Sequence, residues 1–289
     1  MRLWLSLVIL LAASPLDAQQ RATFRRQLAN AAIHRDLAYV ENGHERQKLD
    51  LFVPKDASGG VPVIVWIHGG GWQAGGKENC PPLRAGYVAK GYAVASINYR
   101  LSQHAVFPAQ IDDCVAAIRW LKKHAGTYGL DTDRFGVWGA SAGGHLAALV
   151  GTRGDGGRPI VRAVCDFYGP TDFEAFVATP GYERHAATAS PESRLFGGLV
   201  SERRKLARSA NPIRFVDAGD PPFLIVHGGS DPVVPLNQSE LLAEALKKSG
   251  VPVELEVLED AGHGGPAFQD PATGNRVEGF FAKHLKPAG

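Results

Sequence analysis

Cysteine is scarce in this 289-residue chain, which contains only Cys80, Cys114 and Cys165. An odd number of cysteines cannot pair completely, so a small disulfide-stapled scaffold is excluded. The sequence has no Cys-X-X-Cys pair and no Cys/His cluster with metal-ligand spacing, and we expect neither a metal site nor a cofactor. Cys165 lies in an apolar stretch and is expected to be a small buried hydrophobic residue. A single disulfide between Cys80 and Cys114 stays open as an alternative.

The chain also lacks an excess of charge of one sign. It contains 31 Lys and Arg against 29 Asp and Glu, and its basic clusters are short, such as residues 203–205. This balance does not indicate a nucleic-acid partner. No segment has the length of a transmembrane helix, so we expect no stable membrane insertion.

The N-terminus carries an apolar run that is too short to span a bilayer. Met1 and Arg2 precede apolar residues 3–13, and a small residue, Ala18, follows soon after. This pattern is typical of a secretory signal peptide over residues 1–18, and it predicts a secreted or periplasmic protein. A buried N-terminal helix or an anchor on the lipid face of a membrane is the alternative. Residues 19–35 are the expected N-terminal segment, of which residues 19–32 are polar and helix-compatible.

The remaining residues, 36–289, predict an α/β domain. Two alternating strands flank a turn signal at Asn42-Gly43, and continuous apolar runs follow, which are typical of strands buried on both faces. The predicted strands cover residues 36–40, 48–53, 62–67, 92–97, 134–138, 161–167, 222–226 and 253–258. The predicted helices cover residues 110–123, 144–150, 236–249 and 277–285. Strands that alternate with helices favour a mainly parallel central sheet flanked by helices.

One long stretch, residues 171–216, interrupts this alternation. It is rich in Ala, Pro, Arg and Glu, and it lies between two predicted strands. We interpret it as a helical insertion over the carboxyl edge of the sheet, where such sheets bind ligands. An ordinary long crossover with extra helix is the alternative.

A candidate nucleophile lies in Gly139-Ala140-Ser141-Ala142-Gly143, between a predicted strand and a helical run. A sharp strand-to-helix turn strains the backbone at the serine and therefore needs small neighbours on both sides. The turn also places the serine hydroxyl at a helix N-terminus, where the helix dipole favours developing negative charge. Ser141 is therefore the predicted nucleophile.

A serine needs a base, and the base needs an orienting acid. His263 lies in a Gly-rich loop after the last predicted strand, and Asp231 follows the strand before it. The order Ser, Asp, His along the chain is the order that this kind of fold uses. The rival bases are His68, His145 and His227, and the rival acids are Asp166, Asp172 and Asp220. For each rival histidine we expect a structural hydrogen bond, and for Asp172 a loop-fixing role.

The segment His68-Gly69-Gly70-Gly71-Trp72 directly follows a buried strand. Glycines allow backbone N–H groups to converge on a small anion, so the amides of Gly70, Gly71 and Ala142 are the predicted oxyanion hole. The amide of Trp72 is an alternative donor, and its side chain is a candidate for substrate binding.

These motifs together resemble the hormone-sensitive-lipase-like branch of the α/β-hydrolase fold. Finer features are similar to secreted bacterial esterases grouped as acetyl xylan or feruloyl esterases. Those features are residues 96–102, 107–110, 168–172 and 235–239. The resemblance covers residues 36–285, and it implies an α/β-hydrolase serine esterase.

The expected activity is serine-dependent hydrolysis of carboxylic esters through an acyl-enzyme. The expected substrates are small esters or an esterified plant polysaccharide with short-chain acyl or feruloyl groups. Export favours these substrates, and so do the aromatic residues that are candidates for lining the pocket, which are Trp72, Tyr99, Phe107, Phe173, Phe176 and Tyr182. Peptidase or formamidase chemistry with the same triad, and a non-catalytic binding module, are the alternatives.

Overall fold

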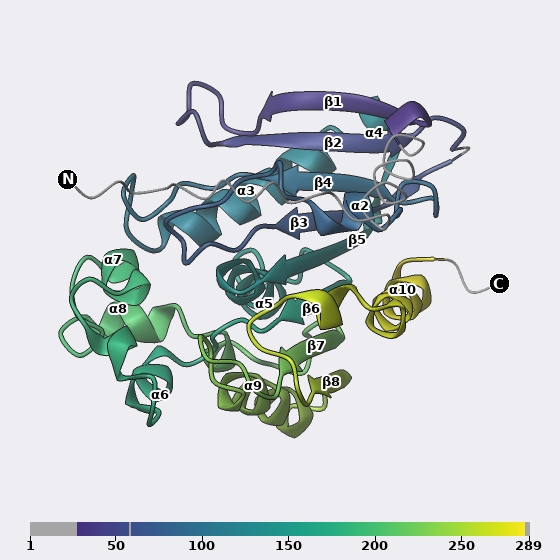
Figure 1. The fold of residues 1–289 in the computed structure, drawn as a ribbon. Coiled ribbons are helices and arrows are strands. Elements are labelled where there is room, and N and C mark those ends of the chain that lie inside the picture. Colours follow the sequence, from purple (N-terminus) through teal and green to yellow (C-terminus); the bar gives the residue numbers. More distant parts are fainter. Residues whose placement is uncertain (1–27, 58, 287–289) are drawn as a thin grey trace, which may run out of the picture.

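The computed structural model describes residues 28–57 and 59–286 (Figure 1). The signal peptide expected over residues 1–18 lies outside these residues. Within the described part of the chain, no helix combines the length and the apolar character that crossing a membrane requires.

An eight-stranded sheet forms the centre of the molecule, in the order β1-β2-β4-β3-β5-β6-β7-β8. Strands β1, β2 and β4 pair antiparallel, and all later pairs are parallel. The strands are β1 (Ala31–Ala38), β2 (Lys48–Pro54), β3 (Val61–Ile67), β4 (Ala93–Ile97), β5 (Leu130–Ala140), β6 (Ala163–Phe167), β7 (Phe223–Gly228) and β8 (Val253–Leu258). The mainly parallel sheet predicted from the alternating pattern is thus confirmed.

Helices cover both faces of this sheet (Figure 1). One face carries α3 (Ala109–Lys123), α5 (Ala142–Arg153) and α9 (Asn237–Lys248), whose apolar side chains join one core cluster. The other face carries α2 (Pro81–Arg84) and α10 (Pro271–Leu285), which belong to a second cluster. The short helix α4 (Ala125–Tyr128) leads into β5. Apolar burial on both faces explains why the central strands have continuous apolar sequences.

The predicted insertion, residues 171–216, is helical. It contains α6 (Phe173–Ala178), η1 (Glu183–Ala186), α7 (Pro191–Phe196), α8 (Arg204–Ser209) and η2 (Pro212–Arg214). In Figure 1 the helices α6, α7 and α8 lie together at the carboxyl edge of the parallel strands. A further short helix, η3 (Pro266–Gln269), precedes α10.

Several predicted boundaries differ from the structure, and two of them are wrong by five residues or more. Strand β1 begins at Ala31 and not at Asp36. It therefore starts within residues 19–35, which the sequence analysis assigned to a separate N-terminal segment. It is an edge strand with one mostly exposed face, which is why its apolar alternation is weak. Helix α10 begins at Pro271 and not at Val277, because Asp270 caps it by accepting from Ala272 N at 2.8 Å.

The alternative of a disulfide between Cys80 and Cys114 is not realised. All three cysteines are free and buried. Cys80 and Cys165 pack in the cluster beneath α2 and α10, whereas Cys114 packs in the cluster on the opposite face of the sheet. The central sheet therefore separates the thiols of Cys80 and Cys114.

Candidate active site

Ser141 lies in the tight turn between β5 and α5. Its backbone has φ +56° and ψ −123°, a strained conformation for a residue with a side chain. Glycines on both sides make this turn possible. A Cβ at Gly139 would lie 2.0 Å from Gly143 O, and one at Gly143 would lie 2.1 Å from Ile67 O. The chain forms the predicted sharp strand-to-helix turn here because only glycine allows these close approaches.

The structure brings the three predicted triad side chains together. His263 Nε2 lies 2.9 Å from Ser141 Oγ, and His263 Nδ1 lies 2.7 Å from Asp231 Oδ2. Both distances are normal hydrogen bonds. The imidazole therefore connects the serine hydroxyl to a carboxylate, as the transfer of a proton from the serine to the histidine requires.

Asp231 remains an anion although its carboxylate is buried. Burial raises its pKa, but hydrogen bonds from His227 and His263 outweigh this effect, and the pKa falls well below its usual range. The amides of Val233 and Val234 also donate to Oδ1, at 2.7 and 3.0 Å. The charged carboxylate is thus held in one orientation facing His263.

The rival histidines all have structural partners. His68 Nδ1 lies 2.7 Å from Gly69 O, and His145 Nε2 lies 2.7 Å from Ala210 O. Burial is the main cause that lowers the pKa of each to about 4, so both rings are neutral. His227 is fully buried, with Nδ1 2.6 Å from Ser239 Oγ and Nε2 2.9 Å from Val234 O.

His227 nevertheless touches the site, because its Nε2 also lies 3.4 Å from Asp231 Oδ2. The rival aspartates do not. Asp172 caps α6 by accepting from Glu174 N and Ala175 N, and Asp166 accepts from Gly169 N. Asp220 accepts from Asp217 N in a surface turn.

The predicted oxyanion loop adjoins the serine. A Cβ at Gly69 would lie 3.3 Å from Ser141 Cβ. Gly70 and Gly71 have φ +112° and +58°, and a Cβ at Gly70 would lie 2.3 Å from Ala74 O. Among the described residues, no group accepts a hydrogen bond from the amides of Gly70, Gly71 or Ala142. These three N–H groups are therefore available to an oxyanion.

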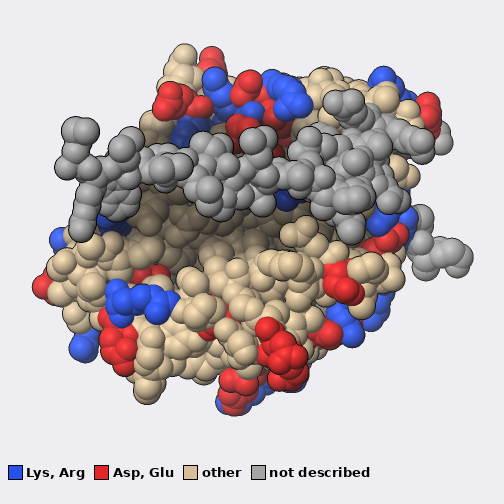
Figure 2. Space-filling model, in the orientation of Figure 1, with Lys and Arg blue, Asp and Glu red and all other residues tan. Residues whose placement is uncertain are grey.

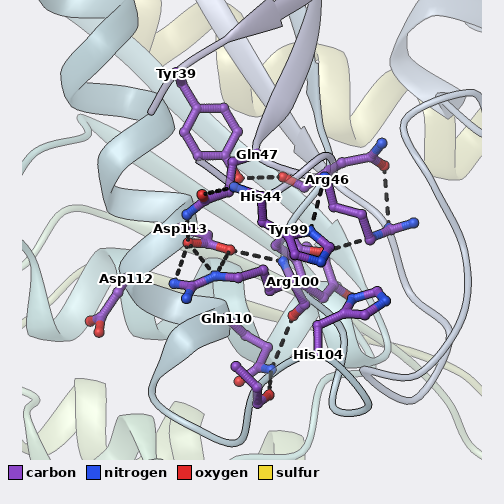
Figure 3. A network of polar contacts seen from close by, with 12 residues as sticks. Tyr39, His44, Arg46, Gln47, Tyr99, Arg100, His104, Gln110, Asp112 and Asp113 are labelled. Atoms are coloured by element: carbon purple, nitrogen blue, oxygen red, sulfur yellow. Dashed lines mark hydrogen bonds and ion pairs between the residues drawn. The ribbon is translucent and has the colours of Figure 1, made fainter. Parts of the chain in front are cut away.

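A polar network from the segments that flank β2 and β4 holds this loop through His68, and Figure 3 shows the part of it around Arg46, Tyr99 and Asp113. Arg46 donates from Nε to Tyr99 O at 2.9 Å, and its Nη2 lies 3.2 Å from His68 Nε2. Tyr99 donates its hydroxyl to His68 O at 3.0 Å. The network continues through Gln47, Arg100 and Asp113. The sequence analysis missed Arg46, because its role depends on contacts between distant segments.

Trp72 lies in the wall of the cavity, but its indole is only 2% exposed. Its Nε1–H donates to His145 Nδ1 at 3.1 Å, and its ring packs against Phe173. His145 is bonded in turn to Ala210 of the insertion. This chain of contacts connects the oxyanion loop, α5 and the insertion. Most of the Trp72 side chain is therefore used in packing inside the protein.

Ser141 and His263 lie in the wall of one cavity of about 1110 Å³, together with Gly70 and Gly71 of the oxyanion loop. The visible hollow in Figure 2 is walled mostly by uncharged residues, and the charged side chains lie around it. Part of the wall comes from the insertion and from Val233 and Val234 of the Asp231 loop. Another part is aromatic, with residues Trp66, Tyr87, Trp138, Phe167 and Phe268.

The insertion is fixed against the Asp231 loop. Tyr182 donates its hydroxyl to Asp231 O, and Arg184 donates to Pro232 O.

Within the residues the structure describes, no three His, Cys, Asp or Glu side chains gather as a metal site. The cavity also contains His185 and Glu192, which the sequence analysis did not single out. No local motif marks these two residues, since η1 and α7 bring them together.

The family model BD-FAE matches residues 49–246 of the chain. The chain belongs to the BD-FAE family. Its architecture is the α/β-hydrolase fold, and the comparisons agree with the resemblance to hormone-sensitive-lipase-like esterases. This BD-FAE protein is similar to esterase LipQ of Mycobacterium tuberculosis, with 32% identity over 257 residues, which are 84% of this chain and 59% of LipQ. It thus spans about three fifths of the length of the first curated relatives it matches.

Two solved structures are also similar to this BD-FAE protein. A truncated carbohydrate esterase from gut microbiota has a TM-score of 0.79 and 28% identity, and the match covers 90% of this chain and 98% of that chain. An acetyl ester-xyloside bifunctional hydrolase from Caldicellulosiruptor lactoaceticus has a TM-score of 0.68 and 28% identity. That match covers 82% of this chain and 88% of the other.

Proposed function

We propose that this chain is a serine-dependent carboxylic ester hydrolase that acts through an acyl-enzyme. The observation that carries the proposal is the contact of His263 with both Ser141 Oγ and Asp231 Oδ2, at 2.9 and 2.7 Å. Membership of a family with esterase relatives supports the same reaction.

In the proposed reaction, Ser141 Oγ attacks the ester carbonyl carbon while His263 Nε2 takes the hydroxyl proton. Asp231 stabilises the imidazolium through Nδ1–H. The carbonyl oxygen becomes an oxyanion that accepts hydrogen bonds from the amides of Gly70, Gly71 and Ala142. When the C–O bond to the alcohol breaks, His263 returns the proton to the leaving oxygen. Water then releases the acid from the acyl-enzyme by the same steps.

We infer that the substrates are short-chain acyl or feruloyl esters of plant polysaccharide. The aromatic wall supports this inference, because Trp66 and Trp138 pack edge to face at 5.6 Å and offer a rigid apolar surface for an aromatic or small acyl group. The solved relatives named as a carbohydrate esterase and an acetyl ester-xyloside hydrolase support the polysaccharide. The expected signal peptide leads us to propose a secreted or periplasmic enzyme.

The test is steady-state hydrolysis of p-nitrophenyl acetate, p-nitrophenyl octanoate and methyl ferulate by the chain and by Ser141→Ala. We expect turnover of acetate or ferulate in preference to octanoate. The Ser141→Ala variant should lose a factor of about 10⁴ or more in kcat, because the nucleophile is removed, and it should keep the wild-type circular dichroism spectrum. Activity that survives this substitution contradicts the mechanism, and a preference for octanoate contradicts the substrate class.

A further inference from the structure

A buried histidine–glutamate pair lies in the insertion, away from the Ser141–His263–Asp231 contacts. His185 of η1 and Glu192 of α7 are 5% and 3% exposed, and His185 Nδ1 lies 3.0 Å from Glu192 Oε1. The ring of Phe176 packs against the imidazole with centroids 4.5 Å apart. All three residues lie in the wall of the cavity that contains Ser141.

The pair is only half satisfied. His185 Nε2 and Glu192 Oε2 are buried, and no atom of the described residues forms a hydrogen bond with either one. Burying an ionisable group without full hydrogen bonding is costly, so native structures rarely keep such atoms without a reason. Two apolar side chains of similar size would fill this wall at a lower cost in stability.

The other buried histidines show what a structural role looks like in this protein. His68, His145 and His227 each have protein partners at both ring nitrogens. His185 differs because, among residues 28–57 and 59–286, only its Nδ1 has a partner, and because the carboxylate beside it in the cavity wall has one oxygen without a partner there. This difference points to a ligand as the missing partner.

We propose that His185 and Glu192 form a subsite for a hydroxyl group of the ester substrate, an inference that rests on the proposed function. A hydroxyl group both donates and accepts, so it can donate to Glu192 Oε2 and accept from His185 Nε2–H when the imidazole carries a proton on both ring nitrogens. Phe176 supplies an apolar face beside them for a phenol ring or the C–H face of a sugar. Because both polar atoms are buried, the contact requires the two side chains to turn toward the cavity.

Two pairs of esters test the proposal and distinguish the two sources of the hydroxyl. Methyl p-coumarate and methyl cinnamate differ by a phenolic hydroxyl on the acyl side. A mono-O-acetylated methyl xyloside and its dideoxy analogue differ by the free sugar hydroxyls on the alcohol side. The readout is the ratio of kcat/KM within each pair for the wild type and Glu192→Gln. His185→Gln is a second variant, in case the first does not fold.

We expect each variant to lower this ratio by about tenfold in one of the two pairs, because a hydrogen bond with a charged group is lost. The matched control is Glu174→Gln, which removes a carboxylate of the same insertion that pairs with Arg208 outside the cavity. The control should leave both ratios unchanged. An unchanged ratio in both pairs for the two variants, or an equal loss on both members of each pair, overturns the subsite.

Equilibrium binding of the same four esters to Ser141→Ala, with and without Glu192→Gln, reads the subsite without catalysis. The hydroxyl-bearing ester of the affected pair should bind about tenfold more weakly after the second substitution. If the wild type hydrolyses none of the esters but this difference in binding persists, the proposed function fails and the subsite stands. If hydrolysis is normal and the difference is absent, the subsite fails and the function stands.

Discussion

Asp231 and Asp166 are two buried aspartates whose surroundings drive their pKa values in opposite directions. Hydrogen bonds from His227 and His263 overcome burial at Asp231 and keep its pKa low. At Asp166, burial dominates and raises the pKa to about 7, since Gly169 N is the one donor to its carboxylate among the described residues. The number of donors around each carboxylate therefore decides its charge.

We expect Asp166 to make the free energy of unfolding depend on pH. Because its pKa is about 7 in the folded protein and lower in the unfolded chain, the folded state binds the extra proton between about pH 4 and pH 7. Stability from this group is therefore complete below pH 4 and is lost as the pH rises toward 7. We expect Asp166→Asn to remove this loss, so that the variant gains Tm over the wild type between pH 5 and pH 8. Thermal unfolding at both pH values tests this, and an equal difference at the two values contradicts it.

We expect a substitution at His227 to shift the pH profile of kcat/KM. Replacing it with Gln removes a hydrogen bond that lowers the pKa of Asp231, so that pKa should rise. A carboxylate with one donor fewer attracts the proton of His263 Nδ1–H more strongly and favours the imidazolium, so we expect the acid limb of kcat/KM for p-nitrophenyl acetate to move to higher pH. His145→Gln is the control, because it removes a buried histidine whose partners are Trp72 and Ala210 and not Asp231. If both variants move the acid limb equally, His227 does not act through Asp231.

The elements that meet at Ser141 leave no space for a methyl group. In Gly143→Ala the new Cβ would lie 2.1 Å from Ile67 O and 2.6 Å from His68 O, so β3 and α5 would have to separate. We expect a loss of about 3 kcal/mol or more, which lowers the Tm by several degrees. Thermal unfolding followed by circular dichroism measures this.

Gly279→Ala is the matched control for this substitution. Gly279 lies within α10, is exposed, and a Cβ there would have no atom within 4 Å. Alanine is the better helix former by about 1 kcal/mol, so this variant should be slightly more stable than the wild type. A Gly143→Ala variant as stable as Gly279→Ala would show that the turn at Ser141 tolerates a side chain.

At the scale of the whole molecule, the sequence predicts the central sheet well and its margins less well. Buried parallel strands have continuous apolar runs, so β3, β4, β6, β7 and the second half of β5 could be placed from sequence, whereas the edge strand β8 alternates apolar residues with Glu. Ser141, Asp231 and His263 each come soon after a parallel strand, and parallel strands end at one edge, so their proximity could be predicted as well. The start of β1 could not, because an exposed edge strand has a weak pattern.

The insertion shows the limit of prediction from sequence. Its helical character could be predicted, but not the contact between His185 and Glu192. Their juxtaposition depends on how η1 and α7 pack over the cavity, and no periodicity encodes that packing. The same holds for Arg46, which reaches the oxyanion loop from a distant turn.

The three buried cysteines can be used to follow how the protein unfolds, because they lie on both faces of the sheet. Burial raises the pKa of Cys80 to about 11 and raises the pKa values of Cys114 and Cys165 well above their usual range. The folded protein should therefore resist thiol-specific dyes at pH 8, and each thiol should react at a rate set by the opening of its own layer. Cys114 reports on the layer beneath α3, whereas Cys80 and Cys165 report on the layer beneath α2 and α10.

Mass spectrometry of labelled peptides at increasing urea concentration would show which thiols are modified first. If all three become labelled together, the two layers open as one cooperative unit. If one layer is labelled earlier, the sheet loses its covering helices one face at a time.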